Sequence, residues 1–316
     1  MNFAPYLITA AVPLISACAM QVPVPSVTQA PTQAVTARAS HTPILTSTAR
    51  PTTTPTLPVP SSIRFNIDNG VSAANVEAIQ EGIAIVHNYL KTMMGGDEAA
   101  NWPNLTVSIF NATSNESCCL GLTKGHNGLY EPGPRFYTLH PEWTNPNTLF
   151  PGGMSLEHQK HSAHEYTHAW QGSLGCVGGQ YGQPLGRWLT EGIAEYAAWN
   201  SLVQAGQLTR EQVASFHINS ALSQSSGRPD FKSWEDPDNL FDWWAYNYAY
   251  LAVEKLVTDA DGPIILRMLC DEAARVAPVT NIRDYLNLDI VMKNLGIDRD
   301  GLYDELPGYF AELFRN

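Results

Sequence analysis

The sequence predicts an α+β fold, with a small mixed or antiparallel sheet and one helix on the N-terminal side and a mainly helical lobe after them. Short segments in the first half alternate apolar and polar residues, which is the period of half-buried strands. Helical spacing dominates after residue 154, and strands that precede helices in this way are typical of the α+β class. The chain has 316 residues, 44% of them hydrophobic, which is enough to bury a large core.

The expected elements follow the spacing of apolar residues along the chain. In the first strand, Ile63, Phe65 and Ile67 alternate with polar residues, whereas the first helix repeats apolar residues at steps of three and four after Ser72, a suitable N-cap. The expected strands are residues 63–67, 105–110 and 135–140. The expected helices are residues 72–93, 155–171, 185–203, 209–223, 246–257, 263–274, 281–295 and 303–314.

Residues 1–18 are expected to be a targeting segment. They contain an apolar stretch that is too short for an ordinary membrane-spanning helix. Its end, Ile15-Ser16-Ala17-Cys18, resembles a bacterial lipobox, in which the cysteine becomes the lipid-bearing N-terminus. A secretory signal that is cleaved near Ala17 or Ala19 is the alternative. Either reading predicts an extracytoplasmic protein of a bacterium, tethered to the cell envelope through Cys18 or secreted.

Residues 19–62 are rich in Pro, Thr and Ser and contain no acidic residue, so we expect a disordered linker. The folded domain is expected to cover residues 63–316, with a sheet part at about 63–153 and a helical part at about 154–316. The net charge is −12, from 18 basic and 30 acidic residues, and this disfavours nucleic acid and anionic membrane surfaces as partners. We expect a monomer.

Four cysteines remain after Cys18, and an even number in an exported chain suggests disulfides. A bond between the adjacent Cys118 and Cys119 would be strained. We therefore expect one of these two to pair with Cys176 or Cys270, and buried free thiols are the alternative. A zinc site built from cysteines is disfavoured, because the chain has no Cys-x-x-Cys pair.

The stretch His164-Glu165-Tyr166-Thr167-His168 carries the clearest chemistry. In a helix, His164 and His168 lie on one face, where two neutral imidazoles can bind one zinc ion. Glu165 lies to the side of both and can reach the open position of the metal without being a ligand. A catalytic zinc needs a third protein ligand and a free site for water, and Glu191 is the best candidate for that ligand. The alternative is a solvated helix with unrelated histidines.

A second segment, Thr190-Glu191-Gly192-Ile193-Ala194-Glu195, supports the metal site. Glu191 and Glu195 are four residues apart and share one face of a second helix. A glutamate there can complete the site, and its neighbour one turn later can accept the free ring N–H of a ligand histidine.

Together with Trp188-Leu189-Thr190-Glu191-Gly192-Ile193-Ala194-Glu195-Tyr196, the first stretch resembles the gluzincin group of zinc metallopeptidases, which includes thermolysin and the aminopeptidase-N-like enzymes. It looks most similar to bacterial peptidase-MA-like domains. The resemblance implies a zincin-like active-site cleft between the sheet part and the helical part, and one catalytic Zn²⁺. It also implies Glu165 as general base and Glu195 as a partner of His164. The implied zinc ligands are His164, His168 and Glu191.

Gluzincins related to aminopeptidase N stabilise the oxyanion with a tyrosine on a later helix. The stretch Tyr246-Asn247-Tyr248-Ala249 looks similar, with Tyr246 as the donor and Tyr248 as the alternative, whereas core packing is the bland reading of each. The resemblance also offers residues 134–139, which include Phe136 and Tyr137, as an edge strand that pairs with an extended peptide. An ordinary strand is the alternative there.

The resemblance implies a zinc-dependent metallopeptidase that hydrolyses a peptide or protein substrate. We expect an endopeptidase, because Gly152-Gly153-Met154-Ser155-Leu156-Glu157 is only faintly similar to the strand with which aminopeptidases hold the substrate amine. Two alternatives remain open. One is a catalytically silent envelope module that binds peptides or glycans on the same scaffold, and the other is a zinc amidohydrolase of non-peptide substrates.

Overall fold

A computed structural model describes the second of the two units into which the chain divides, Met1–Arg50 and Pro51–Asn316. The expected targeting segment and the linker up to residue 56 lie outside the described residues. No helix in the described part of the chain is both long and apolar enough to cross a membrane. The described residues are 57–67, 69–95, 105–111, 135–138, 153–176, 185–223, 229–236, 244–276 and 286–315.

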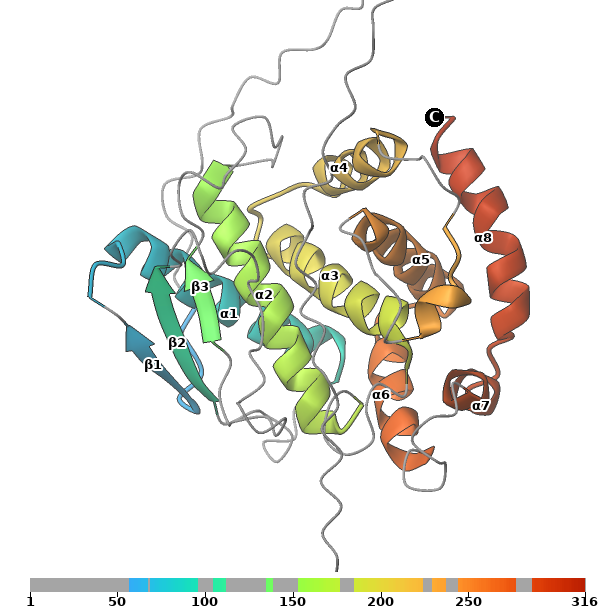
Figure 1. Ribbon diagram of the computed structural model, residues 1–316, viewed down its shortest axis with the longest axis horizontal. Coiled ribbons are helices and arrows are strands. Elements are labelled where there is room, and N and C mark those ends of the chain that lie inside the picture. Colours follow the sequence, from blue (N-terminus) through green and yellow to red (C-terminus); the bar gives the residue numbers. More distant parts are fainter. Residues whose placement is uncertain are drawn as a thin grey trace, which may run out of the picture. The chain divides into compact units, whose positions relative to one another are not determined.

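The sheet has three strands, β1 (Ile63–Ile67), β2 (Leu105–Asn111) and β3 (Arg135–Thr138), in the order β1-β2-β3 (Figure 1). Both strand pairs are parallel, so the expectation of a mixed or antiparallel sheet is wrong. The reason lies in helix α1 (Ala73–Met93), which joins β1 to β2. A helix between two neighbouring strands returns the chain to the end where it started, and the second strand then runs in the same direction as the first.

The expected start of α1 is confirmed, because the side chain of Ser72 accepts a hydrogen bond from the backbone N–H of Asn75 at 3.1 Å. This contact satisfies one of the amides that the first turn of a helix leaves without a partner. On β2, the side chains of Val107 and Ile109 are fully buried and that of Thr106 is exposed, as their alternation predicts. The expected elements of the sheet part therefore form where the apolar pattern places them.

The helical part confirms the α+β class in its coarse outline. In Figure 1 the sheet lies on one side, α2 and α3 lie in the middle and α8 lies on the other side. Each expected helix has a counterpart among the described residues, although the part of the 281–295 helix before Leu286 lies outside them. The elements are α2 (Gly153–Leu174), α3 (Arg187–Gln204), α4 (Arg210–Ser223), the short 3₁₀ helix η3 (Ser233–Glu235), α5 (Ala245–Asp259), α6 (Ile264–Val276), α7 (Leu286–Asn294) and α8 (Arg299–Leu313).

Close helix packing fixes the elements that carry the candidate site. A side chain on Gly82 of α1 would place its Cβ 2.3 Å from the carbonyl oxygen of Gln159 in α2, so only glycine permits this approach. The core between the helices contains large aromatic side chains that are almost fully buried, which adds much buried apolar area. These include Trp170, Trp188, Trp199, Tyr166 and Tyr250.

A disulfide joins Cys176, just after α2, to Cys270 in α6, with their Cα atoms 4.8 Å apart. The expected pairing of Cys118 or Cys119 with one of these two is wrong, because Cys176 and Cys270 pair with each other. Four cysteines allow three connectivities, and the choice depends on the packing of the end of α2 beside α6. Cys118 and Cys119 lie outside the described residues.

Candidate metal centre

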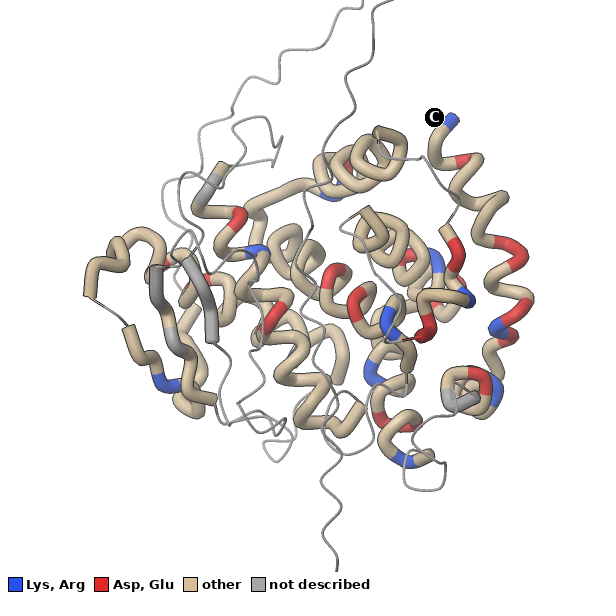
Figure 2. The backbone as a smooth tube through the Cα atoms, viewed as in Figure 1, with Lys and Arg blue, Asp and Glu red and all other residues tan. Residues whose placement is uncertain are grey.

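Helices α2 and α3 lie side by side and supply three donor atoms that could hold a metal ion. The two histidines are one turn apart on α2, and the carboxylate comes from the second turn of α3. Acidic positions occur on neighbouring turns of α2 and α3 in the middle of the helical part (Figure 2). The group consists of His164, His168 and Glu191.

The three donor atoms form a nearly equilateral triangle. The Nε2 atoms of His164 and His168 are 3.0 Å apart, and Oε2 of Glu191 lies 3.1 Å from His168 Nε2 and 3.3 Å from His164 Nε2. In a tetrahedral zinc site with bonds of about 2.0–2.1 Å, neighbouring donor atoms are separated by about 3.3 Å. The triangle is therefore the size that one such ion requires, and two imidazoles with one carboxylate leave a fourth position for water.

The charges around the triangle favour a bound cation. Burial would lower the pKa of His164, but the hydrogen bond with Glu191, the close carboxylate of Glu195 and the charge of Glu165 outweigh it and raise that pKa to about 10. For Glu191, burial would raise the pKa, but the charges of His168 and His164 and the hydrogen bonds with both hold it well below its usual value. The centre thus stabilises positive charge between these side chains, which a divalent metal can supply.

Glu165 follows His164 on α2 and is only 8% exposed. Its charge contributes to the raised pKa of His164 and of His168, which places its carboxylate within electrostatic range of both rings. Glu165 is not one of the three donors, and its role as a base beside the metal stays a prediction.

Gln171 holds the second ring. Its Oε1 accepts a hydrogen bond from Nδ1 of His168 at 2.8 Å, and its Nε2 donates to the carbonyl oxygen of Thr190 at 3.0 Å. With the proton on Nδ1, the lone pair of His168 Nε2 is available to a metal. The hydrogen bond from Gln171 to Thr190 connects the same amide to the residue that precedes Glu191. Sequence reasoning missed Gln171, although its place three residues after His168 on the same helix face was an available signal.

Glu195 lies where it was expected, beside His164. Its Oε1 is 3.0 Å from His164 Nδ1, and its Oε2 accepts a hydrogen bond from Trp199 Nε1 at 2.9 Å. The ammonium group of Lys160 donates to Oε1 of the same carboxylate. Sequence reasoning missed Lys160, whose position four residues before His164 puts it on the same side of α2.

The two candidate tyrosines lie in different surroundings. The ring of Tyr246 is 6.0 Å from that of His164 between centroids, and burial followed by the charge of Glu191 raises its pKa well above the usual value. Tyr248 is buried and its ring contacts those of Trp244 and Phe310, with centroid distances of 5.9 and 5.2 Å. The structure brings Tyr246 to the centre and places Tyr248 in an aromatic cluster with α8.

Phe136 and Tyr137 lie in β3, the last strand in the sheet order. Their backbone positions pair with Ile109 and Phe110 of β2. The pairing of this strand with a peptide substrate stays a prediction.

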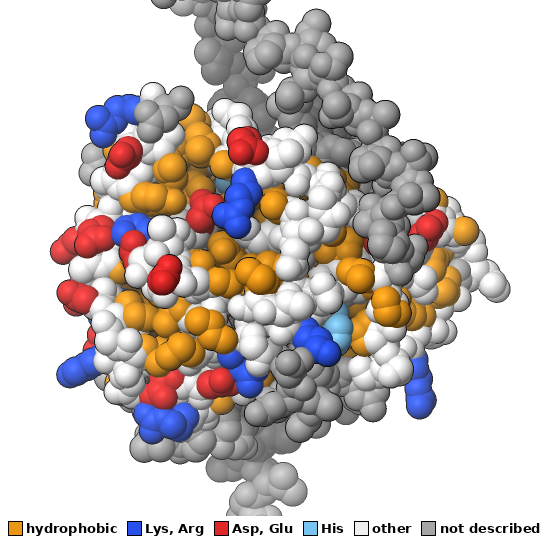
Figure 3. Space-filling model, turned by 180° about the vertical axis from the view of Figure 1, so that it is seen from behind, with side chains coloured by type: hydrophobic (Ala, Val, Ile, Leu, Met, Phe, Trp, Pro, Cys, Tyr) orange, Lys and Arg blue, Asp and Glu red, His pale blue; other side chains and the backbone are white. Residues whose placement is uncertain are grey.

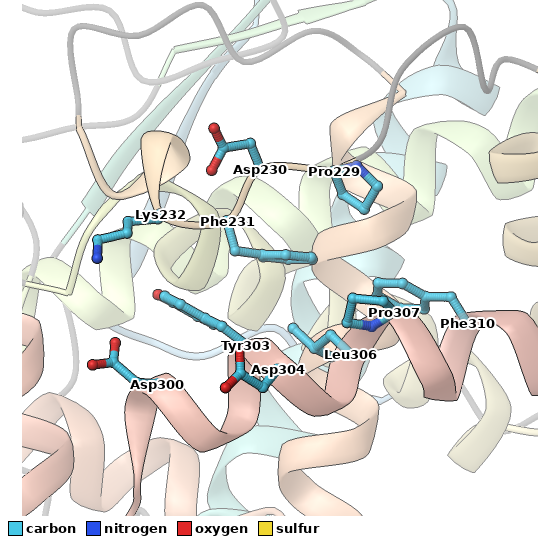
Figure 4. Close-up of a pocket in the computed structure, with 10 residues that line it drawn as sticks. All are labelled: Pro229, Asp230, Phe231, Lys232, Asp300, Tyr303, Asp304, Leu306, Pro307 and Phe310. Atoms are coloured by element: carbon cyan, nitrogen blue, oxygen red, sulfur yellow. The ribbon is translucent and has the colours of Figure 1, made fainter.

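A cavity of about 290 Å³ lies away from the three donors, between the segment before η3 and helix α8 (Figure 4). Its lining contains neither the metal-binding group nor Glu165, so it is not the expected cleft. The rings of Phe231 and Tyr303, which both line it, stack with their centroids 6.1 Å apart. The lining residues are Pro229, Asp230, Phe231, Lys232, Asp300, Tyr303, Asp304, Leu306, Pro307 and Phe310.

Exposed large hydrophobic side chains lie on several elements in the described part of the chain. On the face shown in Figure 3, hydrophobic side chains alternate with charged and polar ones. Among the described residues, the exposed large hydrophobic side chains belong to β1, α1, α4, α6 and α7 and are Ile67, Met93, Leu222, Ile264, Met268 and Ile290.

The candidate centre combines a triangle of possible metal donors, a neighbouring carboxylate and a phenol, which together come from three helices. The donors come from α2 and α3, the carboxylate of Glu165 from α2, and the phenol of Tyr246 from α5. No protein-family model, curated protein or solved structure matches the chain.

Proposed function

We propose that this protein is a zinc-dependent metallopeptidase of the gluzincin type, acting as an endopeptidase on peptide or protein substrates. The observation that carries the proposal is the triangle of His164, His168 and Glu191, whose edges of 3.0 to 3.3 Å suit one tetrahedral ion. Glu165 beside this triangle supplies what a purely structural metal site lacks, a base near the open position.

The donor set fits zinc. Imidazole and carboxylate ligands with an open fourth position are the pattern of catalytic zinc sites, whereas calcium and magnesium prefer oxygen ligands alone. When bound, zinc would supply a Lewis acid and a coordinated water whose pKa is lowered towards neutrality. His164, His168 and Glu191 would hold the ion, and Gln171 and Glu195 would orient the two rings.

The chain's own residues then perform the proton transfers. Glu165 accepts a proton from the attacking water and later gives it to the leaving amine. Tyr246 donates a hydrogen bond to the oxyanion that forms on the scissile carbonyl, and its raised pKa keeps the phenol protonated for this role. The active-site cleft lies between the sheet part and the helical part, and β3, with Phe136 and Tyr137, pairs with the extended substrate.

The place of action is the outside of a bacterial cell. The lipobox-like sequence that ends at Cys18 supports a membrane tether, with free secretion as the other outcome of signal cleavage. The Pro, Thr and Ser-rich linker would then hold the domain away from the membrane. The resemblance to zinc metallopeptidases supports a peptide or protein as the substrate, and the net charge of −12 disfavours nucleic acid as a partner.

The test is the substitution Glu165→Gln. We expect the variant to retain one zinc per chain, measured by elemental analysis, and to lose cleavage of an unbiased peptide library read by mass spectrometry. Its control is Glu157→Gln, which removes a half-buried carboxylate from the same helix without touching the donors and should leave cleavage intact. Undiminished cleavage by Glu165→Gln would overturn the assignment. A zinc-loaded unaltered protein that binds library peptides and cleaves none would favour the silent binding module.

A further inference from the structure

Lys160 is a buried cation on the metal-binding helix. Its side chain is almost withdrawn from water, with the residue 7% exposed, and it lies one turn before His164 on α2. An ammonium group at such a site is costly unless an opposite charge and hydrogen bonds compensate for the lost hydration. Lys160 therefore requires a buried partner of negative charge that also accepts a hydrogen bond from its ammonium group.

That partner is Glu195, which is 4% exposed. Lys160 Nζ donates to Oε1 of Glu195 and Trp199 Nε1 donates to Oε2 at 2.9 Å, so both oxygens of the carboxylate are held from different directions. Lys160 Nζ also lies 5.8 Å from the centroid of the Trp199 ring, within the range of a cation–π interaction. The carboxylate is thereby fixed in one orientation between α2 and α3.

The fixed carboxylate faces the ring of His164. Oε1 of Glu195 is 3.0 Å from His164 Nδ1, yet this buried nitrogen makes no hydrogen bond within the described part of the chain. A carboxylate at this place favours the tautomer with the proton on Nδ1, which leaves Nε2 to bind a metal. Because the alignment is not made by a strong bond to the ring itself, it depends on what holds Glu195 in place.

The balance of buried charges around the centre also points to Lys160. Three glutamates, Glu165, Glu191 and Glu195, lie around the two rings, as their effects on the pKa of His164 indicate. A divalent ion neutralises two carboxylates. Lys160 neutralises the third, so the centre can keep a base and an orienting carboxylate beside the ligand Glu191 without excess buried negative charge.

We infer that Lys160 is a positioning residue of the metal centre, which fixes Glu195 and through it the metal-binding orientation of His164. This inference rests on the proposed function only in taking zinc as the metal. It assigns a role in metal affinity that can be measured without any catalysis.

The experiment measures the affinity of the purified protein for zinc alone, by competition with a chelating zinc indicator. We expect Lys160→Met to weaken zinc binding about tenfold or more, the range for loss of an outer partner of a ligand. If only the charge of Lys160 mattered, Lys160→Met would tighten zinc binding instead, because loss of a nearby positive charge reduces the repulsion of Zn²⁺. Equal or tighter binding by Lys160→Met would therefore overturn the inference.

Three further substitutions sharpen the result. Lys255→Met removes another ion-paired lysine, bonded to Asp259 on α5, and should leave zinc affinity unchanged. In the background of Glu195→Gln, Lys160→Met should have little additional effect, because Lys160 acts through that carboxylate. A full and additive effect would instead mean that Lys160 acts by another route, against the inference. Lys160→Gln retains a donor to Glu195, and serves in the same cycle where Lys160→Met does not fold.

The outcomes separate this inference from the proposed function. A protein that binds zinc with the expected dependence on Lys160 but cleaves no peptide overturns the peptidase proposal and supports the positioning role. Normal peptide cleavage together with a zinc affinity that does not depend on Lys160 supports the peptidase proposal and overturns the positioning role. An unaltered protein without measurable zinc binding overturns both.

Discussion

Gly192 of α3 lies directly against the backbone of Ala249 in α5. A Cβ atom on Gly192 would be 2.8 Å from the carbonyl oxygen of Ala249, a distance that real side chains do not adopt. Glu191 precedes this glycine, and Tyr246 lies one turn before Ala249. The missing side chain therefore lets the helix with the third metal donor approach the helix with the phenol.

We expect Gly192→Ala to lower the free energy of unfolding by about 1–3 kcal/mol, because the added methyl group forces α3 and α5 apart. Chemical denaturation measures this change. Gly308→Ala in α8 is the matched control, since a Cβ there meets nothing within 4 Å. The control should be neutral or stabilise by up to about 1 kcal/mol through the higher helix propensity of alanine. Equal destabilisation by both substitutions would contradict the packing argument.

The two tyrosines provide a second matched pair. Tyr246→Phe should reduce kcat about 100- to 1000-fold, the usual loss when one oxyanion donor is removed, and should leave the zinc content unchanged. Tyr248→Phe should keep kcat, because the ring of Tyr248 packs against Phe310 with centroids 5.2 Å apart. Steady-state kinetics on one cleaved peptide measure both. A larger loss for Tyr248→Phe would reverse the assignment of the donor.

Glu191→Ala should weaken retention of the metal itself. The substitution removes one of three donors and leaves His164 and His168 as a weaker pair. Elemental analysis after dialysis should find zinc in the unaltered protein and little in the variant. Zinc should also raise the Tm of the unaltered protein but not that of the variant, because a ligand stabilises the folded state only when it binds to it. The control Glu211→Ala, an exposed position at the start of α4, should behave like the unaltered protein.

His217 predicts a pH dependence of stability. Its ring is buried, stacks on Tyr250 with centroids 3.8 Å apart and contacts Asn247 Oδ1 through Nδ1 at 2.9 Å. Burial lowers its pKa to about 3. An unfolded chain, with a histidine pKa of about 6.5, takes up this proton at a higher pH than the folded protein does.

The contribution of neutral His217 is therefore complete above about pH 6.5 and declines as the pH falls towards 3. His217→Phe keeps an aromatic ring on Tyr250 and cannot be protonated. Its Tm should fall less steeply between pH 7 and pH 4 than that of the unaltered protein, as measured by calorimetry. Parallel pH profiles for the two proteins would refute this account.

The residue pair on each of the two helices could be predicted, because helix geometry alone places its members on one face. Residues four apart share a face, so His164 with His168 and Glu191 with Glu195 each form a pair that the sequence alone reveals. Tyr246 was reached through the family resemblance. Periodicity gives no distance between two helices, so the approach of α3 to α2 came only from the structure.

Two residues around the centre were missed, Gln171, which bonds to His168, and Lys160, which bonds to Glu195. Lys160 and Gln171 are of types that usually lie in water, and the sequence does not show that both are buried here. The direction of the strands was also misjudged, because an alternating pattern carries no direction. The helix between the first two strands was the signal for parallel pairing, and it was present in the sequence.

The bond between Cys176 and Cys270 closes a loop that contains all of α3, α4 and α5. A single backbone cut within that loop, including one that the proposed peptidase activity would make on a second copy of the chain, would leave both fragments covalently joined. Such a nicked chain would migrate as one species in a non-reducing gel and separate into two pieces once a thiol is added. Self-digestion of this protein would thus stay hidden from any purity check that omits reductant.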